Sequence, residues 1–340
     1  MSDRIKVGVI GCGYWGPKLA RNFHELPDAE LTWVSDLRAD RLEHIRKLYP
    51  SCRTTQDYQE ILASKVDAVV IATPVSTHYP LAMEALRSDK HVLVEKPLAD
   101  SSVHAMELAD SAERRGRVLM VGHTFQYNPA VNVVRDLIAS GELGQVYYIN
   151  ATRVNLGLLQ PDINVIWDLA PHDISILLHI LGADPFQVSA TGQVYIQKRQ
   201  RIHEVAYLTL YFPGGILANV RVSWLDPVKQ RRVTIVGSQK MLVYDDIADE
   251  KVTLYDKGVE VPPYSDTLEE FHMSYRSGPE TVVPVPWQEP LRAECQAFVD
   301  WIRTGRPACS DAWNGVKVVR ILEAAQKSLL NGGVRENTDL

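Results

Sequence analysis

The chain has 340 residues, of which 46% are hydrophobic and 23% are charged, a composition typical of a globular protein that is long enough for two domains. Its net charge of −6 argues against nucleic acid or an anionic membrane as a partner. No apolar run approaches the roughly 20 residues of a membrane span, and no signal peptide precedes the first predicted strand, so we expect a cytoplasmic protein.

The first predicted strand is the apolar run Val7–Ile10, which leads into glycines at G-x-G-x-x-G spacing. In a dinucleotide site, Gly11 would allow a tight turn, Gly13 would let the backbone approach a pyrophosphate, and Gly16 would let the next helix pack on the sheet. A helical pattern follows over 19–26, so phosphates would lie at the N–H groups of its first turn. The motif therefore predicts a dinucleotide site.

A second apolar run, over 31–35, ends in Asp36, about 20 residues after the last glycine, which is the spacing of a ribose-binding carboxylate. Such a carboxylate can accept both ribose hydroxyls and would repel a 2′-phosphate, which favours NAD over NADP. Arg38 keeps NADP as an alternative, because an arginine can accept a 2′-phosphate. Asp36 could instead cap a helix over 39–45, but the strand, the glycines and the spacing together favour the cofactor.

Strands predicted at 67–73, 91–96 and 118–122 then alternate with helices over 78–87 and 101–115. This alternation predicts a doubly wound parallel sheet with right-handed crossovers. Ligands of such sheets bind at the carboxyl ends of the strands. Besides the glycines and Asp36, we expect cofactor contacts there from Tyr14, Trp15, Thr73, Pro74, His78, Glu95 and Lys96, and a substrate contact from His123.

The regular alternation of predicted strands and helices ends at about residue 124. We therefore expect an NAD-binding domain over 1–123 and a substrate-binding and oligomerisation domain over 124–340. The second domain is predicted to hold an antiparallel sheet with one solvated or partner-covered face, and the segment 248–281 is predicted to be a long loop. Its predicted helices are 128–140, 167–181, 288–304 and 311–331, and its predicted strands are 144–153, 206–212, 215–223, 232–236 and 241–244, with a hairpin turn at Pro213-Gly214-Gly215.

Two side chains have the chemistry to remove a proton from a hydroxyl as hydride leaves its carbon. Lys96 follows a buried strand. At such a strand end its amine would be partly desolvated and would lie near a reacting oxygen. His172 carries an imidazole, which can accept or release a proton near neutral pH. It shares a helix face with Asp168 if that helix starts near Asp168. The plainer alternatives are a salt-bridged lysine, a packing histidine and an N-cap aspartate.

The four cysteines, Cys12, Cys52, Cys295 and Cys309, form no C-x-x-C pair and no zinc spacing, so we expect reduced thiols and no metal site.

The segments Gly11–Gly16, Ala72-Thr73-Pro74, Glu95-Lys96-Pro97 and Asp168-x-x-x-His172, in this order, resemble the glucose–fructose oxidoreductase, inositol dehydrogenase and rhizopine catabolism (Gfo/Idh/MocA) family over nearly the whole chain. The resemblance implies a Rossmann domain followed by an α/β domain whose large, mostly antiparallel, open-faced sheet commonly builds dimers or tetramers. It implies that Lys96 is the active-site lysine, His172 the general acid/base and Asp168 its neighbour. One departure is Ser175, where the family often carries an aspartate.

Within this family, the segments Val121–Ala130 and Trp167–Asp173 are similar to members that act on nucleotide sugars, including UDP-N-acetylglucosamine-type 3-dehydrogenases. Arg153 and Asn155 precede the helix of His172 and could contact a sugar or a phosphate, although a surface salt bridge is the ordinary alternative for Arg153. We therefore expect an NAD-dependent sugar dehydrogenase. The alternatives are a dehydrogenase of a free polyol, inositol or sugar phosphate, and a regulator that binds NAD without turnover.

Overall fold

The computed structural model describes residues 4–260 and 274–338. Contacts divide the chain into two compact units, each built from two segments. The first unit is Met1–Tyr127 with Gln288–Glu323, and the second is Asn128–Trp287 with Ala324–Leu340.

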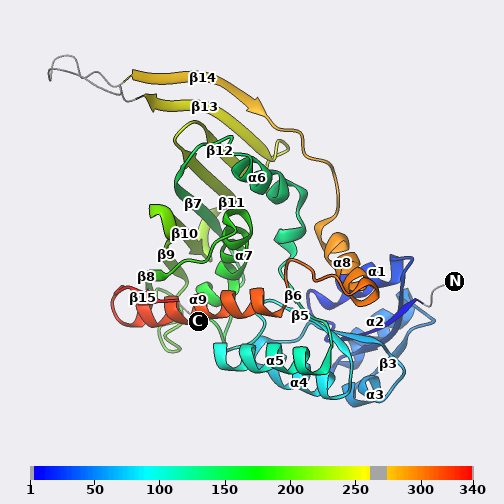
Figure 1. Ribbon diagram of the computed structural model, residues 1–340. Coiled ribbons are helices and arrows are strands. Elements are labelled where there is room, and N and C mark those ends of the chain that lie inside the picture. The colour runs from blue at the N-terminus through cyan, green and yellow to red at the C-terminus, as the bar shows by residue number, and fades with distance from the viewer. Residues whose placement is uncertain (1–3, 261–273, 339–340) are drawn as a thin grey trace. The chain divides into compact units, whose positions relative to one another are not determined.

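The described part of the first unit contains one six-stranded, wholly parallel sheet in the order β3-β2-β1-β4-β5-β6. This is the strand order of a Rossmann fold, with the reversal between β1 and β4, and it confirms the predicted doubly wound sheet (Figure 1). The strands are β1 (Ile5–Ile10), β2 (Ala29–Ser35), β3 (Arg53–Thr55), β4 (Ala68–Ile71), β5 (His91–Glu95) and β6 (Leu119–Gly122). The helices are α1 (Gly16–Glu25), α2 (Ala39–Leu48), α3 (Tyr58–Leu62), α4 (His78–Arg87) and α5 (Ser102–Arg115).

Helix α8 (Pro290–Thr304) comes late in the chain but packs in the first unit. Its apolar residues Leu291, Cys295, Phe298 and Val299 join the buried cluster of β1, β2 and α1. The rings of Phe298 and Phe23 meet edge to face, with centroids 6.3 Å apart. The expected second domain, 124–340, therefore differs from the structural division, because an amphipathic helix buries its apolar stripe wherever a matching surface exists. Helix α9 (Ala312–Leu330) spans the division at Glu323.

The described part of the second unit contains a nine-stranded sheet in the order β14-β13-β12-β11-β7-β10-β9-β8-β15. All of its strand pairs are antiparallel except β7 with β10, which confirms the expectation of a mostly antiparallel sheet. The strands are β7 (Val146–Leu156), β8 (Gln187–Gln193), β9 (Val205–Tyr211), β10 (Leu217–Ser223), β11 (Leu225–Gly237), β12 (Met241–Asp245), β13 (Val252–Glu260), β14 (Ser274–Val282) and β15 (Glu336–Asn337).

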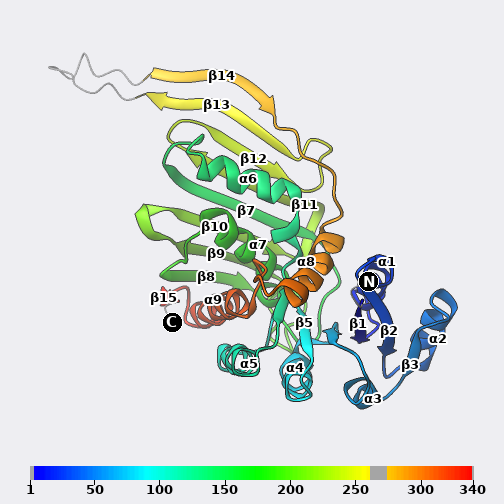
Figure 2. The same ribbon diagram turned by 45° about the vertical axis from the view of Figure 1, so that its right-hand side comes forward.

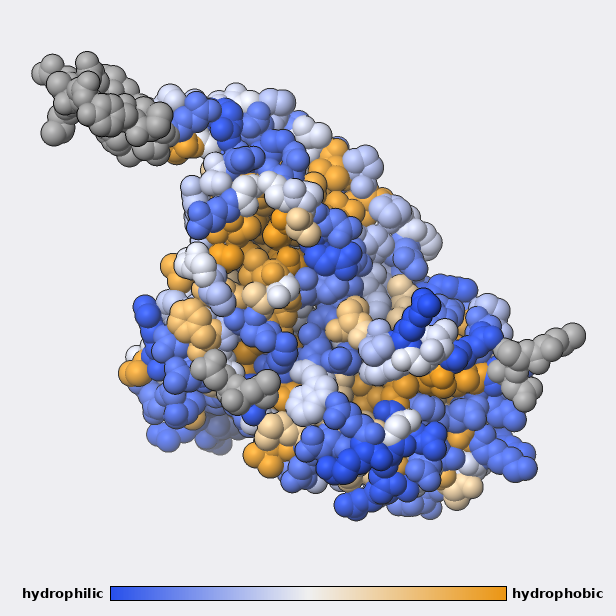
Figure 3. Space-filling view, in the orientation of Figure 1, coloured by the Kyte–Doolittle hydropathy of each residue, from blue (hydrophilic) through white to orange (hydrophobic). Residues whose placement is uncertain are grey.

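Two helices of this unit, α6 (Pro129–Ala139) and α7 (Val165–Leu181), lie against the sheet (Figure 2). The strands alternate accordingly: along β9, Ala206, Leu208 and Leu210 are buried, while Tyr207 between them is 52% exposed. Hydrophobic residues also gather on the surface of this unit in the space-filling view (Figure 3). Among the described residues, no helix combines the length and the apolar character that crossing a membrane requires.

The prediction of a long loop over 248–281 is wrong for most of its described part, because 252–260 and 274–281 lie in the antiparallel pair β13 and β14. Every residue of β14 is exposed or half-buried, since it forms the edge of the sheet. An edge strand of this kind needs no apolar face, so its sequence carries no alternation. Residues 261–273 of the predicted loop lie outside the described residues.

Candidate active site

The glycine loop joins β1 to α1, and its three motif glycines differ in the space around them. Gly11 has φ +97°, and a Cβ there would lie 2.7 Å from the carbonyl oxygen of Ala72. A Cβ on Gly16 would lie 1.9 Å from the carbonyl oxygen of Gly11, whereas a Cβ on Gly13 would meet nothing within 4 Å. Gly11 and Gly16 thus permit close packing, and Gly13 borders open space. No side chain caps the start of α1, so its first turn can receive the phosphates of NAD.

Three aromatic or cationic side chains surround the same turn. The ammonium of Lys18 lies 3.6 Å from the ring centroid of Tyr14 and 4.6 Å from that of Trp15, and both aromatic residues are predicted cofactor contacts. Tyr14 is 76% exposed, and its ring also meets that of Trp15 edge to face. Cys12 is buried in the turn, as expected, and burial raises the pKa of its thiol to about 12.

Asp36 follows β2 and turns its carboxylate back toward the glycine loop. Its Oδ2 accepts from the backbone N–H of Cys12 at 2.6 Å and its Oδ1 from that of Arg38 at 2.9 Å. The guanidinium of Arg38 pairs instead with Asp40, and that of Arg41 lies 3.2 Å from Asp36 Oδ2. Asp36 does not cap helix α2, because the N-cap position is Arg38. The carboxylate of Asp36 thus lies beside the glycine loop, and the ribose contact predicted for it stays a prediction.

His78 lies in the first turn of α4 and is 1% exposed. Its Nδ1 is 2.8 Å from the carbonyl oxygen of Pro97, and its Nε2 is 2.9 Å from that of Thr73. The imidazole therefore ties the loop after β4 to the loop after β5, and burial lowers its pKa. The structure gives this side chain a supporting position, and the cofactor contact predicted for it stays a prediction.

The ends of β5 and β6 bring Glu95, Lys96 and His123 into one largely buried polar group. Glu95 is 8% exposed and accepts from the backbone N–H of Lys96 at 3.3 Å. Burial raises the pKa of Glu95 to about 7, against the opposing charge of Lys96. Burial, and after it the charge of Lys96, lowers the pKa of His123 to about 3. Neither ring nitrogen of this neutral histidine has a hydrogen-bond partner among the described residues, which is the condition expected of a group that meets a ligand.

Glu294 is a member of this group that the sequence did not reveal. It belongs to α8, is fully buried, and its Oε2 accepts from the hydroxyl of Thr124 at 2.9 Å. Burial raises its pKa well above the ordinary value, and the charge of Glu95 acts in the same direction. Its Oε1 has no partner among the described residues. A glutamate on the apolar stripe of α8 was the available signal, because charged residues are rarely buried without a reason.

Helix α7 carries Asp168 and His172, which lie one turn apart on one face. The helix begins at Val165 and is capped by Asn164, whose Oδ1 accepts from the backbone N–H groups of Ile166 and Trp167 at 3.0 and 3.3 Å. Asp168 is therefore not the N-cap. The helix starts two residues before the predicted start at 167, and Pro171 lies inside it.

The side chain of Asp168 is held from outside the helix. Its Oδ2 accepts from the indole Nε1 of Trp224 at 3.0 Å, and Trp224 is 1% exposed. Ser175, at the position where the family often has an aspartate, donates to the carbonyl oxygen of His172 at 2.8 Å. This hydroxyl therefore supports the backbone of the helix that carries the predicted base.

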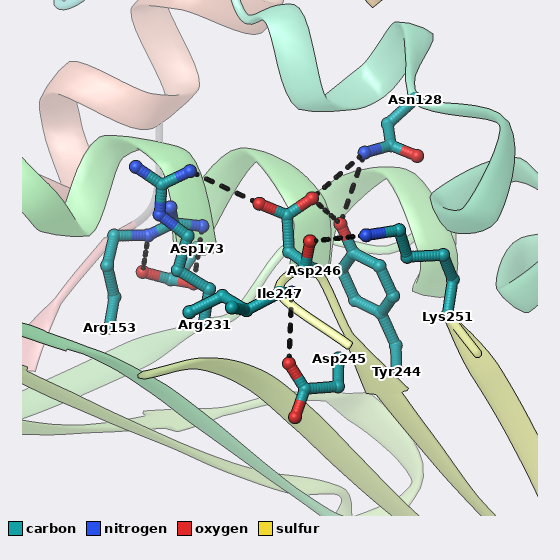
Figure 4. A network of polar contacts seen from close by, with 9 residues as sticks. All are labelled: Asn128, Arg153, Asp173, Arg231, Tyr244, Asp245, Asp246, Ile247 and Lys251. Carbon is teal, nitrogen blue, oxygen red and sulfur yellow. Dashed lines mark hydrogen bonds and ion pairs between the residues drawn. The ribbon is translucent and has the colours of Figure 1, made fainter. Parts of the chain in front are cut away.

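Arg153, a predicted substrate contact, forms two hydrogen bonds with Asp173, so the surface salt bridge considered for it is instead a buried pair. Figure 4 shows this pair beside a second cluster centred on Asp246. The carboxylate of Asp246 accepts from the hydroxyl of Tyr244 at 3.0 Å and pairs with Arg231 at 3.2 Å, and Asn128 donates to both Tyr244 and Asp246. The Arg153–Asp173 pair thus neutralises two buried charges, either of which would be costly if unpaired.

Asn155, the second predicted substrate contact, is half-buried near the end of β7, and its role stays a prediction. Among the residues that the structure describes, no three histidine, cysteine, aspartate or glutamate side chains are grouped so that they could hold a metal ion.

Comparison with known proteins gives matches over both units. The description "Oxidoreductase family, NAD-binding Rossmann fold" matches residues 5–123, and "GFO/IDH/MocA C-terminal domain" matches residues 131–243. The chain is 30% identical to UDP-N-acetylglucosamine 3-dehydrogenase of Acidithiobacillus ferrooxidans, over 94% of this chain and 95% of that protein. It is 28% identical to inositol 2-dehydrogenase of Rubrobacter xylanophilus, over 97% and 92%. The crystal structure of GenD2 from gentamicin A biosynthesis in complex with NAD matches with a TM-score of 0.84 and 25% identity, over 100% and 98% of the two chains.

Proposed function

Because this chain belongs to the Gfo/Idh/MocA family of NAD-binding oxidoreductases, we propose that it oxidises C3 of a UDP-linked N-acetylamino sugar, or reduces the corresponding ketone. The family relation itself makes the chain a sugar or polyol oxidoreductase. The choice of a nucleotide sugar is supported by the full-length relation to a UDP-N-acetylglucosamine 3-dehydrogenase. It is also supported by the segments Val121–Ala130 and Trp167–Asp173, which resemble nucleotide-sugar members.

NAD, when bound, would supply the hydride acceptor, and the side chains of this protein would transfer the proton. His172 takes the proton from the C3 hydroxyl, and Asp168 orients the imidazole from one turn earlier on α7. Lys96 donates a hydrogen bond to the same oxygen and stabilises the negative charge that develops on it. Keto reduction uses the same groups in reverse, with His172 donating the proton.

The cofactor side of this proposal assigns Asp36 to the adenosine ribose and the glycine loop to the pyrophosphate. It assigns Glu95 to the cofactor and His123 to the sugar. The observation that carries the proposal is the polar group Glu95, Lys96 and His123 at the carboxyl edge of the sheet that holds the glycine loop. Glu95 and His123 are buried, and the nitrogens of His123 have no partner among the described residues.

A panel of candidate substrates, monitored by the absorbance of NADH, tests the proposal. UDP-N-acetylglucosamine should be oxidised with the highest kcat/KM. The inositol 2-dehydrogenase relation favours a rival in the same reaction class, for which myo-inositol, scyllo-inositol or a free sugar would give the highest value instead. A protein that binds NADH but oxidises no member of the panel would support a regulator that uses NAD without turnover.

We further propose that the protein is a cytoplasmic homodimer or homotetramer that associates through the sheet of the second unit. The face of this sheet opposite α6 and α7 presents Tyr148, Tyr207 and Leu217, which are 41%, 52% and 41% exposed. Exposed aromatic and aliphatic side chains on a broad sheet are typical of a subunit interface. Light scattering should give a mass of two or four chains, and Tyr207→Glu should reduce it.

A further inference from the structure

Trp224 lies between β10 and β11 and is fixed on three sides. Its indole Nε1 donates to Oδ2 of Asp168 at 3.0 Å. Its backbone N–H donates to the carbonyl oxygen of Glu204 at 2.9 Å, and its own carbonyl oxygen accepts from the N–H of Gly157 at 3.0 Å. With 1% of its surface exposed, the side chain is among the largest that are fully buried. A buried indole requires a hydrogen-bond acceptor, and here the acceptor is a carboxylate on α7.

Gly157 provides the space in which the indole lies. A Cβ at this position would be 3.2 Å from Cδ1 of Trp224, the carbon bonded to the donating nitrogen, and 3.2 Å from Nδ2 of Asn155. Both separations are shorter than an ordinary van der Waals contact. Any side chain at 157 would therefore press on the edge of the ring that holds Asp168. The backbone φ of Gly157 is not in the left-handed region, so space rather than conformation requires the glycine.

From this arrangement we infer that Trp224 is a positioning residue for the dehydrogenase reaction. The indole fixes one carboxylate oxygen of Asp168, which sets the rotamer of that side chain and directs the other oxygen along the helix face shared with His172. The imidazole is thereby held in the orientation that proton abstraction needs. This inference rests on the proposed function, because it gives Trp224 a role only if Asp168 and His172 take part in the reaction.

Trp224→Phe tests the inference, since it keeps an aromatic ring and removes the N–H donor. Loss of a hydrogen bond to a charged group, made by a residue that orients a catalytic side chain, should lower kcat about tenfold or more. The KM for the sugar and the Kd for NAD should stay within about twofold, since Trp224 is assigned no contact with either ligand. Trp287→Phe is the matched control, because Trp287 is 92% exposed. A kcat of Trp224→Phe equal to that of the control would overturn the inference.

A double-mutant cycle with Asp168→Asn separates positioning from general damage to the fold. Adding Trp224→Phe to Asp168→Asn should cost no further activity, because the group that the indole positions is already altered. Full additivity of the two losses would contradict the inference. Asp168→Asn also tests the proposed function separately: wild-type kcat in this single variant would remove Asp168 from the mechanism, whatever Trp224→Phe does.

Gly157→Ala provides a second test that leaves the indole N–H in place. The added methyl group should displace the ring edge and lower kcat, while the melting temperature changes by only a few degrees. If Trp224→Phe fails to fold, this variant still decides the question. An unchanged kcat in a folded Gly157→Ala protein would count against the inference.

Discussion

Arg153 and Asp173 bind each other through two hydrogen bonds, Nε to Oδ2 at 2.7 Å and Nη2 to Oδ1 at 3.1 Å, and their side chains are only 6% and 2% exposed. Asp173 stands next to His172 on α7, so the pair neutralises a charge directly beside the predicted base. The geometry is that of a two-point guanidinium–carboxylate contact, which gives orientation as well as attraction. An anionic substrate group that binds the guanidinium of Arg153 would therefore have to compete with the carboxylate of Asp173.

Asp173→Asn should lower the free energy of unfolding by about 3–5 kcal/mol, because it leaves the Arg153 guanidinium buried without its counter-charge. Replacing both partners, as in Arg153→Met with Asp173→Leu, should recover most of that loss, and urea unfolding measures both changes. The double variant also tests the substrate contact predicted for Arg153. A KM for the nucleotide sugar equal to that of the wild type would contradict that contact.

Lys96→Met and His172→Ala should each abolish measurable turnover while leaving the Kd for NAD within a few fold. The reason is that the two side chains are proposed to act on the substrate oxygen in the transition state. Exposed residues of the same types supply the controls, Lys65→Met and His44→Ala, which should retain full activity. Normal turnover in either active-site variant would remove that residue from the mechanism.

Asp36→Ser should raise the Kd for NAD about tenfold or more, because it removes the carboxylate proposed to accept the ribose hydroxyls. The variant should also narrow the preference for NAD over NADP. Arg38 is bound to Asp40, so Asp40→Ala added to Asp36→Ser should release the guanidinium and improve NADP binding further. Fluorescence titration of the wild type and of both variants with NADH and NADPH, the fluorescent forms of the two cofactors, measures these changes. No gain for NADPH in the double variant would show that Arg38 cannot reach a 2′-phosphate.

Glu95 and Glu294 should make the protein less stable as the pH rises. Burial raises the pKa of Glu95 to about 7 and raises that of Glu294 as well, so the native state holds protons that the unfolded state releases. Their stabilising contribution is complete below the ordinary glutamate pKa of about 4.5 and is lost as the pH rises through the raised values, at about 1.4 kcal/mol per unit of pKa difference.

Glu294→Gln tests this pH dependence, because the amide resembles the protonated acid in shape and carries no charge. The variant should be more stable than the wild type at about pH 8 and should show little gain at about pH 5. The exposed Glu60→Gln should have the same small effect at both pH values, because Glu60 is ionised at both. Equal effects of Glu294→Gln at both pH values would mean that Glu294 is not the group that titrates.

Local chemistry makes much of the first unit predictable from the sequence. The buried strands are continuous apolar runs, and the glycine turn and Asp36 follow strands at fixed spacing, so the order of the residues alone indicates their positions at the carboxyl edge. The start of α7 is harder to predict, because Asn164 supplies the cap and Val165-Ile166 extend the helix by apolar residues that carry no boundary signal. For this reason the sequence pattern predicts a start at residue 167, two residues after the observed one.

Contacts between distant segments cannot be inferred in this way. Glu294 reaches Thr124 across 170 positions of sequence, and Trp224 reaches Asp168 across 56. The residues around Glu294 and Trp224 in the sequence do not indicate these partners, since only the packing of α8 and of the strand ends brings the groups together. The same holds for β14, whose polar edge sequence forms a strand because β13 provides the hydrogen bonds.

The most direct test of the central claim follows the hydride itself. The enzyme with bound NAD is mixed with UDP-N-acetylglucosamine that carries deuterium at C3, in a single turnover, so that a tightly retained cofactor does not hide the reaction. Mass spectrometry of the cofactor should find one deuterium in the NADH formed, and the rate should be lower than with unlabelled sugar. NADH without deuterium, or no NADH with this sugar under conditions in which a polyol reduces the bound NAD, would contradict the account.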